Sequence, residues 1–112
     1  MSFKESKRQK KEVITMEDLR EFFFNSEYEF KFEWINKTAY GDIDPAEELV
    51  RINVRLMLLE TMLHEYYHYT YPSASELEVE LRTRAKVQAM SVSEIFQLTN
   101  EFVATWGGKS GA

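Results

Sequence analysis

The chain has 112 residues, which is the size of a single domain. Its 19 acidic side chains outnumber 14 basic ones, and the resulting net charge of -5 argues against a dedicated nucleic-acid-binding protein. Hydrophobic residues make up 44% of the chain and cysteine is absent. A folded core is therefore expected, whereas disulfides and cysteine-ligated metal sites are excluded.

The two ends of the chain differ in composition from its middle. Residues 1–13 contain five basic side chains and no apolar run follows them, so we predict a flexible basic arm and no signal peptide. The longest apolar stretch, residues 56–63, is too short to cross a bilayer. We expect a cytoplasmic protein without membrane contact, with one domain over residues 14–105 and a flexible tail over residues 106–112.

The first half of the chain predicts one helix and two strands. Thr15 can N-cap a helix over residues 16–24, because acidic residues occupy its first turn. Residues 28–35 alternate between aromatic and charged side chains, the pattern of a half-buried strand. After a turn-rich stretch, residues 50–54 alternate again and predict a second strand, although a helix beginning at Pro45 is a competing interpretation.

The second half predicts three helices. Residues 55–69 are apolar on nearly every side, which is typical of a central, buried helix. Pro72 prevents that helix from continuing, and Ser75 can begin the next one. Ser91 and Glu94 have the spacing of a capping box, which predicts a last helix ending near residue 105.

The only two histidines of the chain belong to an H-E-x-x-H motif formed by His64, Glu65 and His68. Residues i and i+4 of a helix stand one turn apart on the same face, so the two imidazoles can bind one zinc ion. Glu65 projects to the side, where it can take a proton from a zinc-bound water. The motif therefore predicts a zinc site with Glu65 as general base, although two core histidines beside a solvated glutamate are the ordinary alternative.

A third protein ligand must be a carboxylate, because no other histidine or cysteine exists. The candidates Glu76, Glu78 and Glu80 follow the proline turn. A helical wheel at about 100° per residue gives one apolar stripe, made of Leu77, Leu81, Ala85, Ala89 and Val92. Glu78 falls inside this stripe, where a buried charge needs a partner such as zinc, so we predict Glu78 as the ligand. Glu78 can instead complete a capping box with Ser75, and Glu80 and Glu76 remain alternatives.

Three further side chains near the motif have weaker assignments. Tyr69 or Tyr71 could stabilise an oxyanion, although packing at the rim of the core is the more ordinary role of such aromatic residues. Glu60 precedes the first histidine by one turn and could support a ligand, whereas a solvated glutamate is an equally good reading.

The stretch LLETMLHEYYHYTYPSASELEVELRTRA, residues 58–85, resembles the active-site helix and the following glutamate helix of gluzincin metallopeptidases. The pattern E-x-x-x-[DN]-x-x-A of related groups matches Glu78 and Ala85, whereas Arg82 stands where an Asp or Asn would orient a ligand histidine. In length and order of elements the chain is most similar to the minigluzincins, which are minimal soluble zinc peptidases.

The resemblance implies an α+β fold, in which a small sheet packs on a backing helix and is followed by the zinc helix, the glutamate helix and a C-terminal helix. It implies a zinc endopeptidase acting on peptides or unfolded proteins, with His64, His68 and Glu78 as zinc ligands and Glu65 as catalytic base. It also implies latency through a C-terminal segment that obstructs the cleft, here the segment around residues 102–106 and the glycine-rich tail that follows it.

Two other functions compete with the peptidase. The first is a non-catalytic binding or regulatory module that zinc stabilises. The second is a nucleic-acid contact through the basic arm. If the chain is a peptidase, the strand at residues 50–54 is a candidate rim along which an extended substrate could add as another strand.

Overall fold

The computed structural model describes residues 13–107 and has the predicted α+β architecture. Its elements in chain order are α2 (Met16–Arg20), the π-helical turn η1 (Glu21–Asn25), β1 (Glu29–Phe32), β2 (Gly41–Asp44), β3 (Leu49–Ile52), α3 (Val54–Thr70), α4 (Glu76–Ala89) and α5 (Val92–Trp106). No described helix is both long and apolar enough to cross a membrane. Most of the predicted basic arm, and the tail beyond residue 107, lie outside the described residues.

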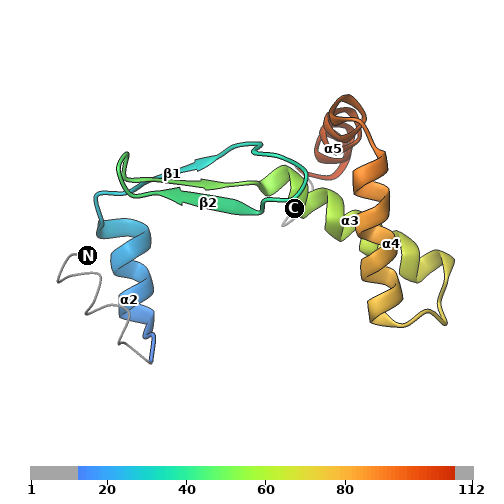
Figure 1. The fold of residues 1–112 in the computed structure, drawn as a ribbon, viewed down its shortest axis with the longest axis horizontal. Coiled ribbons are helices and arrows are strands. Elements are labelled where there is room, and N and C mark those ends of the chain that lie inside the picture. Colours follow the sequence, from blue (N-terminus) through green and yellow to red (C-terminus); the bar gives the residue numbers. More distant parts are fainter. Residues whose placement is uncertain (1–12, 108–112) are drawn as a thin grey trace.

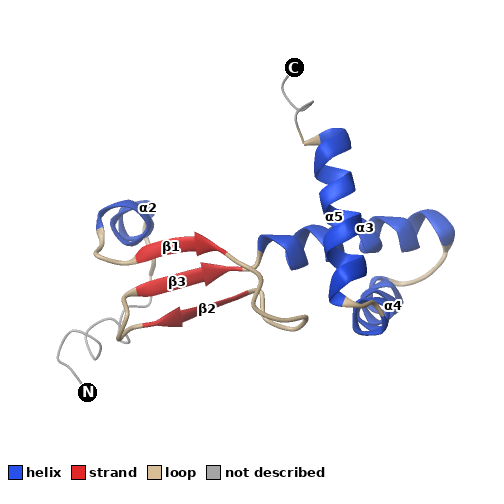
Figure 2. Cartoon of the chain, turned by 90° about the horizontal axis from the view of Figure 1, so that it is seen from above, coloured by secondary structure: helices blue, strands red, loops and turns tan. Residues whose placement is uncertain are grey.

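Two regions are clearly separated in Figure 1. We call α2, η1 and the three strands the sheet arm, and α3, α4 and α5 the helical body. The three helices cross one another at one end of the molecule, and the sheet extends away from them, with α2 below its far end (Figures 1 and 2). The H-E-x-x-H motif belongs to the helical body, because α3 carries it.

Helices α2, α4 and α5 begin where the sequence predicts N-caps. Thr15 and Ser91 each form a complete capping box, with Asp18 and Glu94 respectively. The Ser75 hydroxyl accepts a hydrogen bond from the backbone N–H of Glu78, which caps α4. These contacts span only three residues, so the sequence alone is enough to locate them.

The sheet has the order β1-β3-β2, with β1 parallel and β2 antiparallel to the central β3. The predicted second strand is confirmed, but it ends at Ile52, and Val54 already belongs to α3. Residues 45–48 form a turn, so the competing helix from Pro45 is wrong. Since β3 has neighbours on both sides, it cannot serve as the open edge that we expected for a substrate strand.

No residue of the sheet arm is buried. Phe22 of η1 packs against the ring of Phe30 in β1 at a centroid separation of 5.2 Å, which joins the helical turn to the sheet. The residues of β3 are half-buried, whereas other apolar side chains are open: Phe32 is 79% exposed and Phe24 is 77% exposed. The alternating pattern of β1 therefore predicted the strand correctly, but neither face of this strand is buried in the structure.

The core of the molecule lies in the helical body. Its buried apolar cluster comes from all three helices and consists of Leu56, Leu59, Leu63, Val87, Met90 and Ile95. Trp34 and Phe96 pack against this cluster, with their rings edge to face at 5.5 Å. Trp34 belongs to the loop after β1, so this loop docks on the helices although the strands do not.

Asn53 joins the two regions. It is fully buried, and its side-chain amide donates to the backbone carbonyls of Asn36 and Ala39 at 3.0 Å each. Its side-chain oxygen accepts from the N–H of Leu56 and so caps α3. The strand pattern placed Asn53 on a polar, outward face, and this expectation is wrong because the strand has ended before it.

Candidate metal centre

His64 and His68 stand one turn apart on α3, as the i, i+4 spacing requires. Both are half-buried, with side chains 28% and 31% exposed. Their Nε2 atoms face each other at 3.1 Å, and their ring centroids are 4.7 Å apart. Two ring nitrogens so close need either a shared proton or a cation between them, because their lone pairs otherwise repel.

Glu76 brings a carboxylate to the two histidines from the first turn of α4. Its Oε2 lies 3.2 Å from Nε2 of His64, and its Oε1 lies 2.9 Å from Nε2 of His68. One donor atom from each of the three side chains therefore lies within 4.8 Å of the others. Together they form a cluster that could hold a metal ion.

The structure brings Glu76, and not the predicted Glu78, to the histidines. The face of α4 that packs inward is formed by Val79, Thr83 and Val87. Glu76 precedes Val79 by three residues and so lies on the same side of the helix. Glu78 is exposed, and its backbone N–H is bonded to the Ser75 hydroxyl.

The helical wheel was wrong about which stripe of α4 is buried. Leu77 and Leu81, which anchored the predicted stripe, are 64% and 57% exposed. A wheel selects the most apolar face of an isolated helix, whereas the position of α3 decides which face is covered. Here the buried face of α4 consists of β-branched side chains, and its two leucines face the solvent.

The donor set fits a zinc ion. Two imidazoles and a carboxylate are the three protein ligands found in catalytic zinc sites that keep one position open. In a tetrahedral zinc site with bonds near 2.0–2.1 Å, neighbouring donors are about 3.3 Å apart. The separation of 3.1 Å between the two Nε2 atoms is close to that value, and each Nε2 has one Glu76 oxygen within 3.2 Å, Oε2 for His64 and Oε1 for His68. Glu76 is 72% exposed, which leaves the cluster open to solvent on that side.

The remaining candidate residues near the motif are exposed or have partners outside the cluster. Glu65 directly follows His64, is exposed, and forms no ion pair within the described residues, so its carboxylate is open to water. Tyr69 is 86% exposed. The ring of Tyr71 carries the guanidinium of Arg82 at 4.5 Å from its centroid. Arg82 therefore stacks on Tyr71 and makes no hydrogen bond to either histidine.

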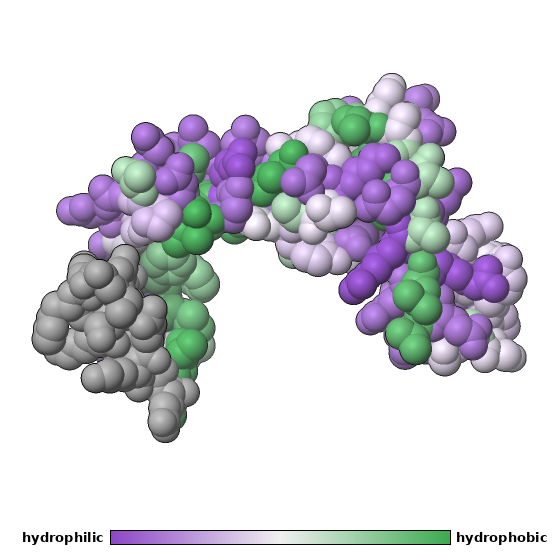
Figure 3. All heavy atoms as spheres, in the orientation of Figure 1, coloured by the Kyte–Doolittle hydropathy of each residue, from purple (hydrophilic) through white to green (hydrophobic). Residues whose placement is uncertain are grey.

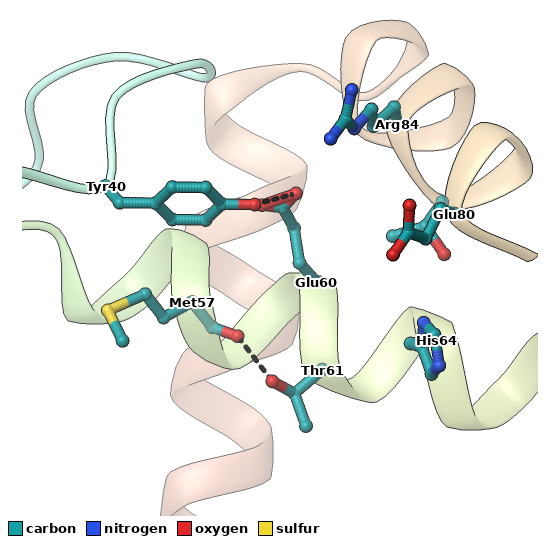
Figure 4. A pocket seen from close by; sticks show the side chains of 8 residues that line it. Tyr40, Met57, Glu60, Thr61, His64, Glu80 and Arg84 are labelled. Carbon is teal, nitrogen blue, oxygen red and sulfur yellow. Dashed lines mark hydrogen bonds between the residues drawn. The ribbon is translucent and has the colours of Figure 1, made fainter. Parts of the chain in front are cut away.

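A pocket adjoins His64 on the side towards the sheet. It is lined by Tyr40, Met57, Glu60, Thr61, His64, Glu80, Thr83 and Arg84 (Figure 4). Tyr40 comes from the loop between β1 and β2 and donates from its hydroxyl to Oε1 of Glu60 at 2.8 Å. That hydrogen bond, then burial and the charge of Glu60, raises the pKa of Tyr40.

Sequence reasoning missed Tyr40, because no local pattern connects a loop residue with a helix twenty positions later. Glu80, an alternative ligand at the sequence level, lies on the pocket wall beside His64 and outside the three-residue cluster. Comparison of the chain with protein-family models, with curated proteins and with solved structures gives no match.

Proposed function

We propose that this protein is a zinc-dependent metallopeptidase of the gluzincin type, related to the minigluzincins. The observation that carries the proposal is the convergence of His64, His68 and Glu76 with their donor atoms inside 4.8 Å. The proposed ligand set is thus His64, His68 and Glu76, with one zinc ion. The resemblance of residues 58–85 supports the peptidase assignment.

The roles of the side chains follow from their positions. A zinc ion held by the cluster would supply a Lewis acid for the peptide carbonyl and for water. Glu65 accepts the proton of the attacking water and returns it to the leaving amine, since its carboxylate is exposed beside the first ligand. Glu76 would complete the ligand set, because its two oxygens lie within 3.2 Å of one Nε2 each.

Residues 102–106 give no support to latency, and the glycine-rich tail named in the same expectation lies outside the described residues. The pocket beside His64 is lined by α3, α4 and the loop between β1 and β2. Val103 and Ala104, from the segment at residues 102–106, line a different pocket together with Phe32. We therefore expect a peptide to reach the cluster without displacing α5.

The decisive experiment separates zinc binding from catalysis. Glu65→Gln should retain one zinc per chain and lose about 100- to 10,000-fold in cleavage of an unfolded protein substrate, because the general base is lost. Glu78→Gln, an exposed change on α4, is the matched control and should keep both properties. Cleavage by Glu65→Gln at the wild-type rate would refute the mechanism.

The third ligand is tested by a second pair of variants. His64→Ala and Glu76→Gln should both weaken zinc binding in competition with a chromophoric chelator, whereas Glu78→Gln should not. If Glu78→Gln lowered zinc affinity and Glu76→Gln did not, the proposed ligand set would be wrong.

A structural zinc module is the second candidate function. It is favoured by the fact that the cluster joins α3 to α4 across their connecting turn, so a metal ion would fix this helical hairpin. This alternative predicts that a chelator unfolds the hairpin and that no peptide is cleaved in the presence of zinc. Circular dichroism with and without chelator, beside the cleavage assay, distinguishes the two.

A further inference from the structure

The pocket beside His64 has the size and the position of a side-chain subsite. Its volume is about 490 Å³, ample for one amino-acid side chain. His64 forms part of its wall, so one end of the pocket adjoins the metal-binding cluster. Tyr40 closes the opposite end (Figure 4). A ligand group bound at the cluster can therefore place its neighbouring side chain in the pocket.

Two carboxylates and one guanidinium set the charge of the pocket. Glu60 comes from α3, and Glu80 and Arg84 come from α4. Within the described residues neither carboxylate has a lysine or arginine partner within 4.0 Å. The side chains that line the pocket thus sum to a formal charge of about -1. A zinc ion held with Glu76 would add about +1 at the His64 end, so any attraction for a positive side chain has to come from Glu60 and Glu80 at close range. A positive side chain would gain more from these groups than a negative one.

The behaviour of Tyr40 agrees with this charge balance. Its pKa is raised first by the hydrogen bond to Glu60, then by burial and by the negative charge of Glu60. Arg84 acts in the opposite direction and Glu80 adds to the rise. The guanidinium therefore does not cancel the two carboxylates at the tyrosine hydroxyl.

The remaining walls suit an aliphatic stem. Met57 lies along one side of the pocket, and the ring of Tyr40 extends across it (Figure 4). Lysine and arginine side chains place their methylene groups against such surfaces while the charged end reaches polar groups. An apolar wall with acidic groups further along it therefore fits a long basic side chain.

We propose that this pocket is a specificity subsite for a lysine or arginine side chain of the peptide substrate, with Glu60 and Glu80 as the groups that attract it. This proposal rests on the proposed peptidase function and names the substrate class of the same site.

The test measures binding and does not need catalysis. The probes are the α-hydroxamates of N-acetyl-lysine, N-acetyl-norleucine and N-acetyl-glutamate, whose hydroxamate group anchors at zinc. Binding to the full zinc-loaded chain is followed by calorimetry, with chelator-treated protein as the blank. We expect the lysine probe to bind about tenfold more tightly than the norleucine probe, which corresponds to about 1.4 kcal/mol. The glutamate probe should bind most weakly.

Charge variants locate the effect. Glu80→Gln should lower the lysine-to-norleucine affinity ratio several-fold, because it removes one of the two carboxylates. Arg84→Gln should raise the same ratio, because it removes the opposing charge. Glu78→Gln, the same chemical change on the same helix but outside the pocket, should leave the ratio unchanged.

Each result decides one proposal. The subsite proposal would be overturned if the lysine and norleucine probes bound equally or if the glutamate probe bound most tightly. It would also be overturned if Glu80→Gln and Glu78→Gln had equal effects on the affinity ratio. Chelator-sensitive binding of all probes with equal affinity would do so while leaving the metal centre intact. If no probe bound the zinc-loaded chain, the metal centre would fall and the subsite with it. Peptide cleavage without basic preference would leave the peptidase standing and refute the subsite alone.

Discussion

The helical body and the sheet arm have similarly apolar sequences but very different burial. In the helical body, Leu56 and Leu59 of α3 are almost completely buried, whereas in the sheet arm Phe24 and Phe32 are more than three-quarters exposed. Figure 3 shows apolar residues open to solvent along the sheet and the helix below it, and also in patches on the helical body, so the two regions differ in their interior and not in having an open apolar surface. An apolar pattern therefore predicts which element forms, and a neighbouring element decides whether its apolar face is covered.

The same comparison locates the functional groups. The candidate metal cluster lies where α3 and α4 pack together, with two half-buried histidines from α3 and an exposed glutamate from α4. The sheet arm reaches this region only through the loop between β1 and β2, which contributes Tyr40 to the pocket. The helical body thus supplies all three side chains of the cluster, and the loop supplies Tyr40 to the wall of the neighbouring pocket.

The largest expected effect is a difference in stability between a body variant and an arm variant. Leu59→Ala should lower the free energy of unfolding by about 2–5 kcal/mol, because it opens a cavity in the buried cluster. Phe32→Ala should change it by no more than about 0.5 kcal/mol. Urea denaturation followed by circular dichroism measures both. Equal losses would show that the strands are covered in solution.

Zinc should stabilise the body and not the arm. At a free zinc concentration of 100 times the Kd, binding should add about 2.7 kcal/mol to the stability of the helices that it joins. Amide hydrogen exchange in α3 and α4 should slow, while exchange in the three strands stays the same. His68→Ala with zinc is the control without the metal. Equal slowing in the sheet would show that the two regions unfold together.

Asn53→Ala should weaken the connection between the two regions. It removes the cap of α3 and leaves two backbone carbonyls without their donor, at a cost of about 2 kcal/mol. Asn53→Asp keeps the capping oxygen but turns a buried carboxylate towards the two carbonyl oxygens, so it should cost at least as much as Asn53→Ala in urea denaturation. If neither variant changed the free energy of unfolding, the hydrogen bonds from Asn53 to the loop between β1 and β2 would not contribute to stability.

The smallest effect concerns the pKa of an exposed carboxyl group in the arm. The Arg51 guanidinium donates to Asp42 across the β2–β3 pair at 2.9 Å and holds the pKa of Asp42 below its ordinary value. The stability from this pair is present above the ordinary aspartate pKa and is lost as the pH falls through the lowered one. Arg51→Gln should raise the pKa of Asp42 in an NMR titration, whereas Lys31→Gln should not. An unchanged pKa would show that the pair does not form in solution.

Local signals in the sequence located most of the fold. The caps at Thr15, Ser75 and Ser91 depend on contacts three residues apart, and the structure contains all three. The alternating stretches became strands, and the helix that carries the motif formed where its apolar run predicted it. Beyond single elements the prediction was weaker, because the central place of β3 depends on strands that are distant in sequence.

The candidate site shows the same division. The sequence by itself determined that His64 and His68 share a helix face, because the α-helical repeat fixes their spacing. It also determined that a third ligand must be a carboxylate, because no other histidine or cysteine exists. Only the tertiary structure showed that Glu76 is the carboxylate lying beside the two histidines, because it has Val79, Thr83 and Val87 as the buried face of α4. The tertiary structure likewise placed Tyr40 beside Glu60, because a loop from the sheet reaches a helix that no local interaction connects to it.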